Sequence, residues 1–283
     1  MNIILLGSTG YLGTHLIPRF TAQGHCLLCV GRDATRLLAL QQQFPGIQTC
    51  SFEQLDTVLS QQEPFDCMVN TLCQYPRGAE SEAAIFAANL VVPLQSFLTC
   101  TAHGVHRVIT IDTGLSDSFN AYSISKAKFA ELLHWYADRL STQGKALQIC
   151  NVQLENFYGP DEPTDRFLPG TVQKLKQDLP IPLTAGAQKR DFIHIDDVLD
   201  TLTALLTAPL PCYLDLPLGT GEAVPVRQVI EYLQELLGSH SELRFGAVPL
   251  RQNEPDSVAD LTALHRLGLS IRYSWKDGLK CFL

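Results

Sequence analysis

The sequence has no excess of positive charge. Its 283 residues include 21 Lys and Arg against 29 Asp and Glu, a formal net charge of -8. Nucleic acids and anionic membrane surfaces attract basic proteins, so we expect neither as a partner. No apolar run reaches the roughly 18 residues of a membrane span. The N-terminus lacks the basic segment of a secretion signal, and its first apolar run ends at Gly7. We therefore expect a cytoplasmic protein.

The sequence also lacks a second pair of cysteines that could complete a zinc site with Cys26 and Cys29. Nine cysteines without a secretion signal are expected to be reduced thiols. Cys26 and Cys29 have C-x-x-C spacing, but they lie in an apolar run that predicts a strand. Residues three apart on a strand point to opposite faces, and no other pair completes a zinc site. We expect buried structural thiols and no metal.

Glycine is concentrated at the start of the chain. Residues 3–6 are apolar and predict a buried strand, and from Tyr11 the apolar residues recur at helical spacing. A glycine-rich turn between a strand and a helix lets the backbone approach a dinucleotide diphosphate at the helix N-terminus. The sequence therefore predicts a dinucleotide site at Gly7, Thr9, Gly10, Tyr11, Leu12 and Gly13.

The second predicted strand, residues 26–30, indicates which dinucleotide binds. An acidic residue at the end of this strand holds the ribose of NAD, whereas arginine accommodates the 2′-phosphate of NADP. Here Gly31 replaces the acid, Arg32 follows it, and Arg36 lies one helical turn further on. We favour NADP(H) over NAD(H). The alternatives are that Arg32 is a solvated surface residue and that Asp33 serves NAD.

Strands and helices alternate along the first half of the chain. This order predicts an α/β fold, a Rossmann-type doubly wound parallel sheet with a smaller C-terminal substrate-binding portion. We expect a dinucleotide-binding domain over residues 1–155, with segments around 190–220 returning to it, and a mainly substrate-binding portion over 156–283. The further strands are expected at 67–72, 107–111 and 147–154, and the helices at 81–103, interrupted near Pro93, and 121–140.

Tyr122 and Lys126 are four residues apart on the predicted helix 121–140, so they share one face. A lysine ammonium near a phenol favours the phenolate, so we expect a lowered pKa for Tyr122. Such a tyrosine can give or take a proton at neutral pH. The pair follows a strand that should end beside the nicotinamide, which favours catalysis over a surface role.

Together these motifs resemble the extended short-chain dehydrogenase/reductase family, the NAD-dependent epimerase/dehydratase family. The likeness covers essentially the whole chain and is strongest to bacterial CDP- and dTDP-hexulose reductases. The motifs that carry it are the glycine turn, Asn89, Tyr122 with Lys126, residues 156–160, residues 190–198 and the turn 219–222.

The resemblance implies roles for individual residues. Tyr122 would give or take the proton, Lys126 would activate it and bind ribose, and Thr113 would polarise a sugar carbonyl. The segment from Thr113 to Tyr122 is shorter than is usual in the family, so Thr110 and Ser116 remain alternatives. The remaining expected contacts are Leu72, Cys73, Asn89 and Ile111 with the cofactor, and Tyr75, Arg77, Thr113, Asn156, Arg190 and Arg251 with the substrate.

Two expected substrate-side residues have plainer alternatives. Arg190 could instead pair with Asp196 or Asp197 at the surface. His194 is expected to be structural rather than catalytic.

The resemblance also implies a reaction. Family dehydratases carry an Asp-Glu pair where this sequence has Gly114 and Leu115, so a dehydratase is not expected. A reductase would use NADPH to reduce the C4 keto group of a nucleotide-activated 4-keto-6-deoxy sugar, for deoxysugar or surface-polysaccharide biosynthesis. The alternatives are a 4-epimerase with tightly bound NAD and a non-catalytic cofactor-sensing protein. A homodimer through the helices at 81–103 and 121–140 is expected.

Overall fold

A computed structural model describes residues 1–283 apart from 77, 79, 116–118, 145 and 250–255. The chain forms two compact units and passes between them several times. Unit 1 comprises Met1–Thr113, Asn120–Gln153 and Thr201–Leu216, and unit 2 comprises Gly114–Phe119, Leu154–Asp200 and Pro217–Leu283.

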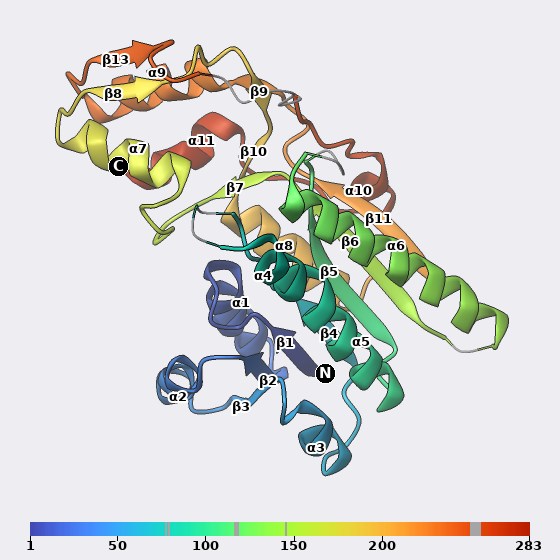
Figure 1. The fold of residues 1–283 in the computed structure, drawn as a ribbon. Coiled ribbons are helices and arrows are strands. Elements are labelled where there is room, and N and C mark those ends of the chain that lie inside the picture. The colour runs from blue at the N-terminus through green and yellow to red at the C-terminus, as the bar shows by residue number, and fades with distance from the viewer. Residues whose placement is uncertain (77, 79, 116–118, 145, 250–255) are drawn as a thin grey trace. The chain divides into compact units, whose positions relative to one another are not determined.

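A seven-stranded sheet with the order β11-β6-β5-β4-β1-β2-β3 organises the first unit (Figure 1). Its strands pair in parallel from β5 through β4, β1 and β2 to β3. The expected Rossmann-type sheet is confirmed. The strands are β1 Asn2–Leu6, β2 Cys26–Gly31, β3 Gln48–Ser51, β4 Cys67–Asn70, β5 Arg107–Thr113, β6 Gln148–Leu154 and β11 Tyr213–Leu218.

Helices connect these strands and supply the core. Phe97, Phe129 and Leu133 pack with the strand residues Ile4 and Met68 in one buried cluster. The π-helical turn η1 ends at Val91, two residues before Pro93, near which an interruption is expected from the sequence. The helices are α1 Tyr11–Ala22, α2 Ala34–Gln43, α3 Leu55–Ser60, α4 Glu82–Phe86, η1 Ala87–Val91, α5 Val92–Ala102, α6 Ala121–Thr142 and α8 Ile195–Leu205.

Two strand ends differ from the sequence prediction, and both differences matter at the site. β4 ends at Asn70, two residues early, so Thr71 and Leu72 belong to the following loop. β5 extends to Thr113, which places that hydroxyl at the last position of a strand. Apolar runs mark the buried part of a strand, and hydrogen bonding at its ends is set by neighbouring strands.

The continuous helical run Glu82–Ala102 has a mean hydropathy of 1.6 over its most apolar window and is long and apolar enough to cross a membrane. Asn89, Gln95 and Ser96 interrupt it, so it is not an uninterrupted apolar run of the length of a membrane span. Core helices of globular proteins meet the same criterion. Here the run contacts α3, α6 and β4, and Phe97 and Cys100 are fully buried.

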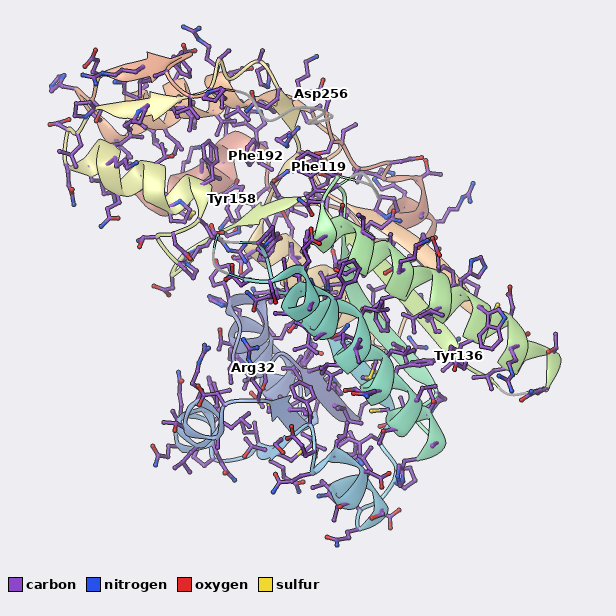
Figure 2. The ribbon with its side chains drawn as sticks, viewed as in Figure 1. Arg32, Phe119, Tyr136, Tyr158, Phe192 and Asp256 are labelled. Atoms are coloured by element: carbon purple, nitrogen blue, oxygen red, sulfur yellow. The ribbon has the colours of Figure 1, made fainter. Side chains whose placement is uncertain are left out.

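Unit 2 has its own core, around Tyr158, Phe192, Ile230 and Trp275. Tyr158 and Phe192 are labelled in Figure 2. The Tyr158 hydroxyl donates to the Trp275 carbonyl at 3.1 Å. Strands pair as β7–β10, β8–β13 and β9–β12. Its elements are β7 Asn156–Tyr158, α7 Phe167–Lys176, β8 Ile181–Leu183, β9 Lys189–Arg190, β10 Phe192–His194, β12 Val224–Pro225, α9 Val226–Leu237, β13 Leu243–Phe245, α10 Thr262–Arg266, α11 Trp275–Leu279 and η2 Lys280–Phe282.

The C-x-x-C pair is only half buried. Cys29 lies inside the sheet, where burial raises the pKa of its thiol to about 12. Cys26, at the first position of β2, is exposed, so the expectation of a buried thiol is wrong there. Both faces of β2 are buried beyond its first residue, since Leu28, on the same face as Cys26, is 1% exposed. Cys26 is exposed because it lies at the very start of the strand.

Candidate active site

The glycine turn joins β1 to α1 with almost no space to spare. Gly7 has φ +78°, a conformation that L side chains rarely adopt, and its carbonyl accepts from the Gly10 N–H at 2.9 Å. A Cβ on Gly13 would clash with the Gly7 carbonyl and lie 2.8 Å from Ser8 Cα. Only hydrogen atoms fit at these positions, which brings the start of α1 against the strand.

The N-terminus of α1 suits an anionic group. Gly10 is its N-cap and has no side chain, so nothing of its own covers the first helical N–H groups. Tyr11 and Leu12 are the first two residues of α1, and the Leu12 side chain is buried within unit 1. A glycine turn that brings backbone N–H groups to the positive end of a helix fits a dinucleotide diphosphate.

Two arginines, Arg32 and Arg36, follow the end of β2. The strand itself contains no carboxylate. A Cβ on Gly31 would lie 3.3 Å from Leu37 Cδ2, so the site of the usual acid is tight. Asp33 instead caps α2, with its Oδ1 accepting from Arg36 N at 3.0 Å. The Arg36 guanidinium donates to the Thr9 carbonyl in the glycine turn, and Arg32 is exposed (Figure 2).

Lys126 joins three segments of unit 1. Its Nζ donates to the Leu72 carbonyl at 2.8 Å and to the Ile111 carbonyl at 2.6 Å. Asn120 caps α6 through a capping box with Ser123, which fixes where the helix begins. The buried ammonium therefore ties the ends of β4 and β5 to the first turns of α6.

Tyr122 lies one turn before Lys126 and is buried, with 3% of its surface exposed. Burial raises the pKa of its phenol well above the ordinary value; Cys73 and Tyr75 add to this and a hydrogen bond with Thr113 opposes it. The expected lowering of this pKa is therefore not found. Burial also lowers the pKa of Lys126. A neutral phenol is the form that can donate a proton.

Tyr75 lies against Tyr122 in the loop after β4. The ring centroids are 4.3 Å apart, and the Tyr122 hydroxyl donates to the Tyr75 hydroxyl at 3.4 Å. Asn89 fixes this loop, with its Oδ1 accepting from Gln74 N at 2.8 Å and its Nδ2 donating to the Gln74 carbonyl at 3.0 Å. Asn89 thus positions the loop from a π-helical turn, a feature frequent at functional sites.

Asp112 is a residue of this region to which the sequence analysis assigned no role. Its Oδ1 accepts from Thr113 N at 2.8 Å, and its Oδ2 accepts from Asn151 Nδ2 at 3.0 Å. Its charge opposes the lowering of the pKa of Lys126. Thr110, an alternative to Thr113, accepts from Asn70 Nδ2 at 2.9 Å inside the sheet. A carboxylate next to the last residue of a mostly buried strand is the signal that could have indicated Asp112.

In unit 2, Asn156 and Arg190 both lie beside Asp191. The Asn156 N–H donates to the Asp191 carbonyl at 3.1 Å, and the Asn156 side chain is exposed. Arg190 is 6% exposed and donates to the Lys189 carbonyl at 2.7 Å. Its burial does not match the alternative of a surface ion pair. The Asp191 carboxylate accepts from Thr220 N, Gly221 N and Ala259 N.

His194 is built into the second unit. Its Nδ1 accepts from Asp196 N at 3.2 Å, and its ring packs edge-on against Tyr158 at 5.7 Å. Both contacts fit a structural role. Three residues named from the sequence, Arg77, Ser116 and Arg251, lie outside the residues that the structure describes.

The glycine turn and the Tyr122–Lys126 pair thus lie in unit 1 in the order that the resemblance implies. The family model described as NAD dependent epimerase/dehydratase matches residues 3–211 of the chain. The chain belongs to the NAD-dependent epimerase/dehydratase family. The family resemblance expected from the motifs is confirmed.

Curated relatives in this family span nearly the whole chain. A CDP-abequose synthase of Salmonella muenchen is 25% identical over 290 residues, which cover 100% of this chain and 97% of the relative. A CDP-abequose synthase of Salmonella typhimurium is 26% identical over 293 residues, covering 98% and 96%.

Solved structures of the epimerase/dehydratase type show the same fold. A Thermotoga maritima UDP-glucose 4-epimerase with UDP-glucose superposes with a TM-score of 0.84 at 18% identity, covering 100% of this chain and 97% of the other. A dTDP-glucose 4,6-dehydratase of Bacillus anthracis in complex with NAD gives 0.82 at 14% identity, covering 99% and 94%. One fold thus serves several reactions, which the residues must distinguish.

Proposed function

We propose that this protein is a cytoplasmic, NADPH-dependent reductase of the C4 keto group of a nucleotide-activated 4-keto-6-deoxy sugar. The observation that carries the proposal is the buried phenol of Tyr122, hydrogen-bonded with Thr113 and one helical turn from Lys126. A raised pKa keeps the phenol neutral, and reduction of a ketone needs a proton donor at the oxygen.

The comparisons support this class of reaction. Both CDP-abequose synthases match from end to end, so they favour the CDP-abequose and CDP-paratose synthase type of enzyme. Gly114 and Leu115 offer no acid–base pair after Thr113, which argues against a dehydratase.

Residues of the glycine turn and of α6 are proposed to bind the cofactor, and Thr113 and Tyr122 are proposed to act on the sugar carbonyl. Gly7, Gly10 and Gly13 would hold the diphosphate of the cofactor, and Lys126 a ribose hydroxyl. When bound, the nicotinamide supplies the hydride. The Thr113 hydroxyl would hydrogen-bond the carbonyl oxygen, and Tyr122 would transfer its proton to that oxygen as negative charge develops there.

Substrate binding is proposed for unit 2. Arg190 and Asn156 would hold the nucleotide diphosphate, because a guanidinium pairs well with phosphate oxygens. Tyr75, Arg77 and Arg251 are proposed as further substrate contacts.

The test follows the absorbance of reduced nicotinamide with CDP-, dTDP-, UDP- and GDP-linked 4-keto-6-deoxy sugars, each with NADPH and with NADH. Oxidation of NADPH with one nucleotide class supports the reductase and identifies its substrate. Tightly bound NAD together with C4 epimerisation would replace the proposal with the 4-epimerase. Cofactor binding without turnover of any of these sugars would favour a sensing protein.

The cofactor preference gives a prediction at Arg32. Replacing Arg32 with Ala should weaken NADPH binding about tenfold or more, because a charge-assisted contact with the 2′-phosphate would be lost. NADH has no such phosphate, so its affinity should not change and serves as the internal control. Nicotinamide fluorescence titrations measure both. Equal losses for both cofactors, or a wild type that prefers NADH, would contradict the proposal.

We further propose a homodimer formed through α5 and α6. Leu98 and Trp135 are large apolar side chains on these helices, and 39% and 52% of their surfaces are exposed. Burying such side chains against a second copy is favourable. Trp135→Asp should yield monomers in sedimentation velocity, whereas Leu38→Asp, which replaces a 56% exposed leucine of α2, should not. A wild-type monomer would refute the dimer.

A further inference from the structure

Glu155 is a carboxyl group at the ligand edge of the sheet to which nothing above assigns a role. It directly follows β6, the neighbour of β5, and its backbone N–H donates to the Leu218 carbonyl at 2.9 Å. In sheets of this kind ligands bind beyond the carboxyl ends of the strands. Only 9% of the Glu155 surface is exposed. Such a buried carboxyl group needs an explanation.

Gly114 makes room for this carboxyl group. A Cβ on Gly114 would lie 2.6 Å from the Glu155 carboxyl carbon and closer still to its Oε1. The Gly114 N–H donates to the Leu154 carbonyl at 3.0 Å, so the two backbones cannot easily separate. The Glu155 carboxyl group therefore occupies the place of a side chain at the position that directly follows Thr113 in the chain.

Three side chains face Glu155 from other segments: Asp191, Arg190 and Ser257. Asp191 is fully buried, and its carboxylate accepts from Thr220 N at 2.7 Å and Gly221 N at 2.9 Å. These N–H donors hold the Asp191 carboxylate in place. A negative charge on Glu155 is opposed by Asp191 and favoured by Arg190.

The balance makes Glu155 titrate near neutral pH. Burial raises the pKa of its carboxyl group to about 7; Asp191 adds to the rise, and the Ser257 hydroxyl and Arg190 oppose it. Below that pH Glu155 is a neutral acid, and above it the group carries a negative charge beside Arg190. The charge of this cluster thus falls by one unit as the pH rises through neutrality.

We propose that Glu155 makes binding of the nucleotide-sugar diphosphate depend on pH, because its ionised form offsets the charge of Arg190. This inference rests on the proposed function, which places the diphosphate at Arg190. With Glu155 neutral, only the charge of Asp191 opposes the attraction between Arg190 and the diphosphate. With Glu155 ionised, the cluster gains one further negative charge, which repels the diphosphate, and binding weakens.

The decisive variant is Glu155→Gln, which keeps the shape and cannot ionise. For the wild type, KM for the nucleotide sugar should rise about fivefold to tenfold between about pH 6 and about pH 8 while kcat changes much less. In Glu155→Gln, KM should stay near its low-pH value across this range. A merely structural glutamate would alter stability in the variant and leave the slope of KM against pH unchanged.

Glu162→Gln is the matched control. Glu162 is another buried carboxyl group of unit 2 whose pKa burial raises to about 7, and it pairs with Arg166 at 3.3 Å. Arg190 does not contribute to the pKa of Glu162. Glu162→Gln should therefore keep the wild-type pH dependence of KM. Loss of the dependence in Glu162→Gln, or its persistence in Glu155→Gln, would overturn the inference.

Direct binding separates this inference from the proposed reaction. CDP-glucose and UDP-glucose have diphosphate esters that do not titrate near neutral pH, so calorimetry with them needs no turnover. Weaker binding at high pH in the wild type, absent in Glu155→Gln, would support the inference even if no ketone were reduced. Binding that is independent of pH in the wild type would refute it even if the reductase activity were found.

Discussion

Tyr122→Phe is expected to lower kcat by about a thousandfold while cofactor affinity changes by less than about twofold. In the proposed reaction the phenol is the proton donor, and its raised pKa keeps the proton in place at neutral pH. Removing one oxygen takes away that proton and the hydrogen bond with Thr113, but leaves the ring packed against Tyr75. Steady-state rates with the reduced cofactor, together with fluorescence titration, measure the two effects separately.

Tyr136→Phe provides the control on the same helix. Tyr136 lies on α6 (Figure 2). Its ring packs against Phe97, with 5.5 Å between the ring centroids. Tyr136→Phe removes a phenol hydroxyl from the same helix, as Tyr122→Phe does. Because Tyr136 has no role in the proposed reaction, kcat should stay at the wild-type value. If Tyr122→Phe retained turnover, Tyr122 would not be the proton donor. If the wild type bound cofactor but turned over no sugar, a sensing protein would be the better explanation.

The parts of the molecule that the sequence predicts are those whose physics is local. The glycine spacing after residues 3–6 determines the turn, because Gly7 adopts a positive φ and Gly13 leaves no room for a Cβ. Likewise, the four-residue spacing of Tyr122 and Lys126 places both on one face of α6. These features depend on neighbours along the chain, so sequence patterns predict them.

Electrostatics at the site is set by segments far apart in sequence, which explains the failures. The pKa of Tyr122 depends first on its burial and next on Cys73 and Tyr75, which come from another loop. The four-residue spacing indicates only that Lys126 lies near Tyr122, and it does not indicate how deeply the phenol is buried. The charge of Glu155 is likewise set by distant segments. Its pKa depends on Asp191, and its carboxyl group fits in place only because Gly114 has no side chain. A sequence shows these residue types without showing that they meet.

Gly13→Ala is expected to weaken cofactor binding about tenfold or more and to lower Tm by about 5 °C. The added Cβ would meet the Gly7 carbonyl and lie 2.8 Å from Ser8 Cα, and both are backbone atoms that cannot rotate away. Either α1 moves away from β1 or the turn opens, and each change displaces the N–H groups that would hold the diphosphate. Fluorescence titration with NADPH and thermal melting measure the two effects.

Gly46→Ala separates this effect from the general cost of replacing a glycine. Nothing lies within 4 Å of a Cβ built on Gly46, and its φ is not in the left-handed region. Alanine there should leave cofactor binding unchanged and Tm equal or slightly higher, because it restricts the unfolded chain. A Gly13→Ala protein with the melting temperature and NADPH affinity of the wild type would mean that the turn does not hold the cofactor. Lower Tm with unchanged affinity would assign Gly13 to packing alone and move the diphosphate away from α1.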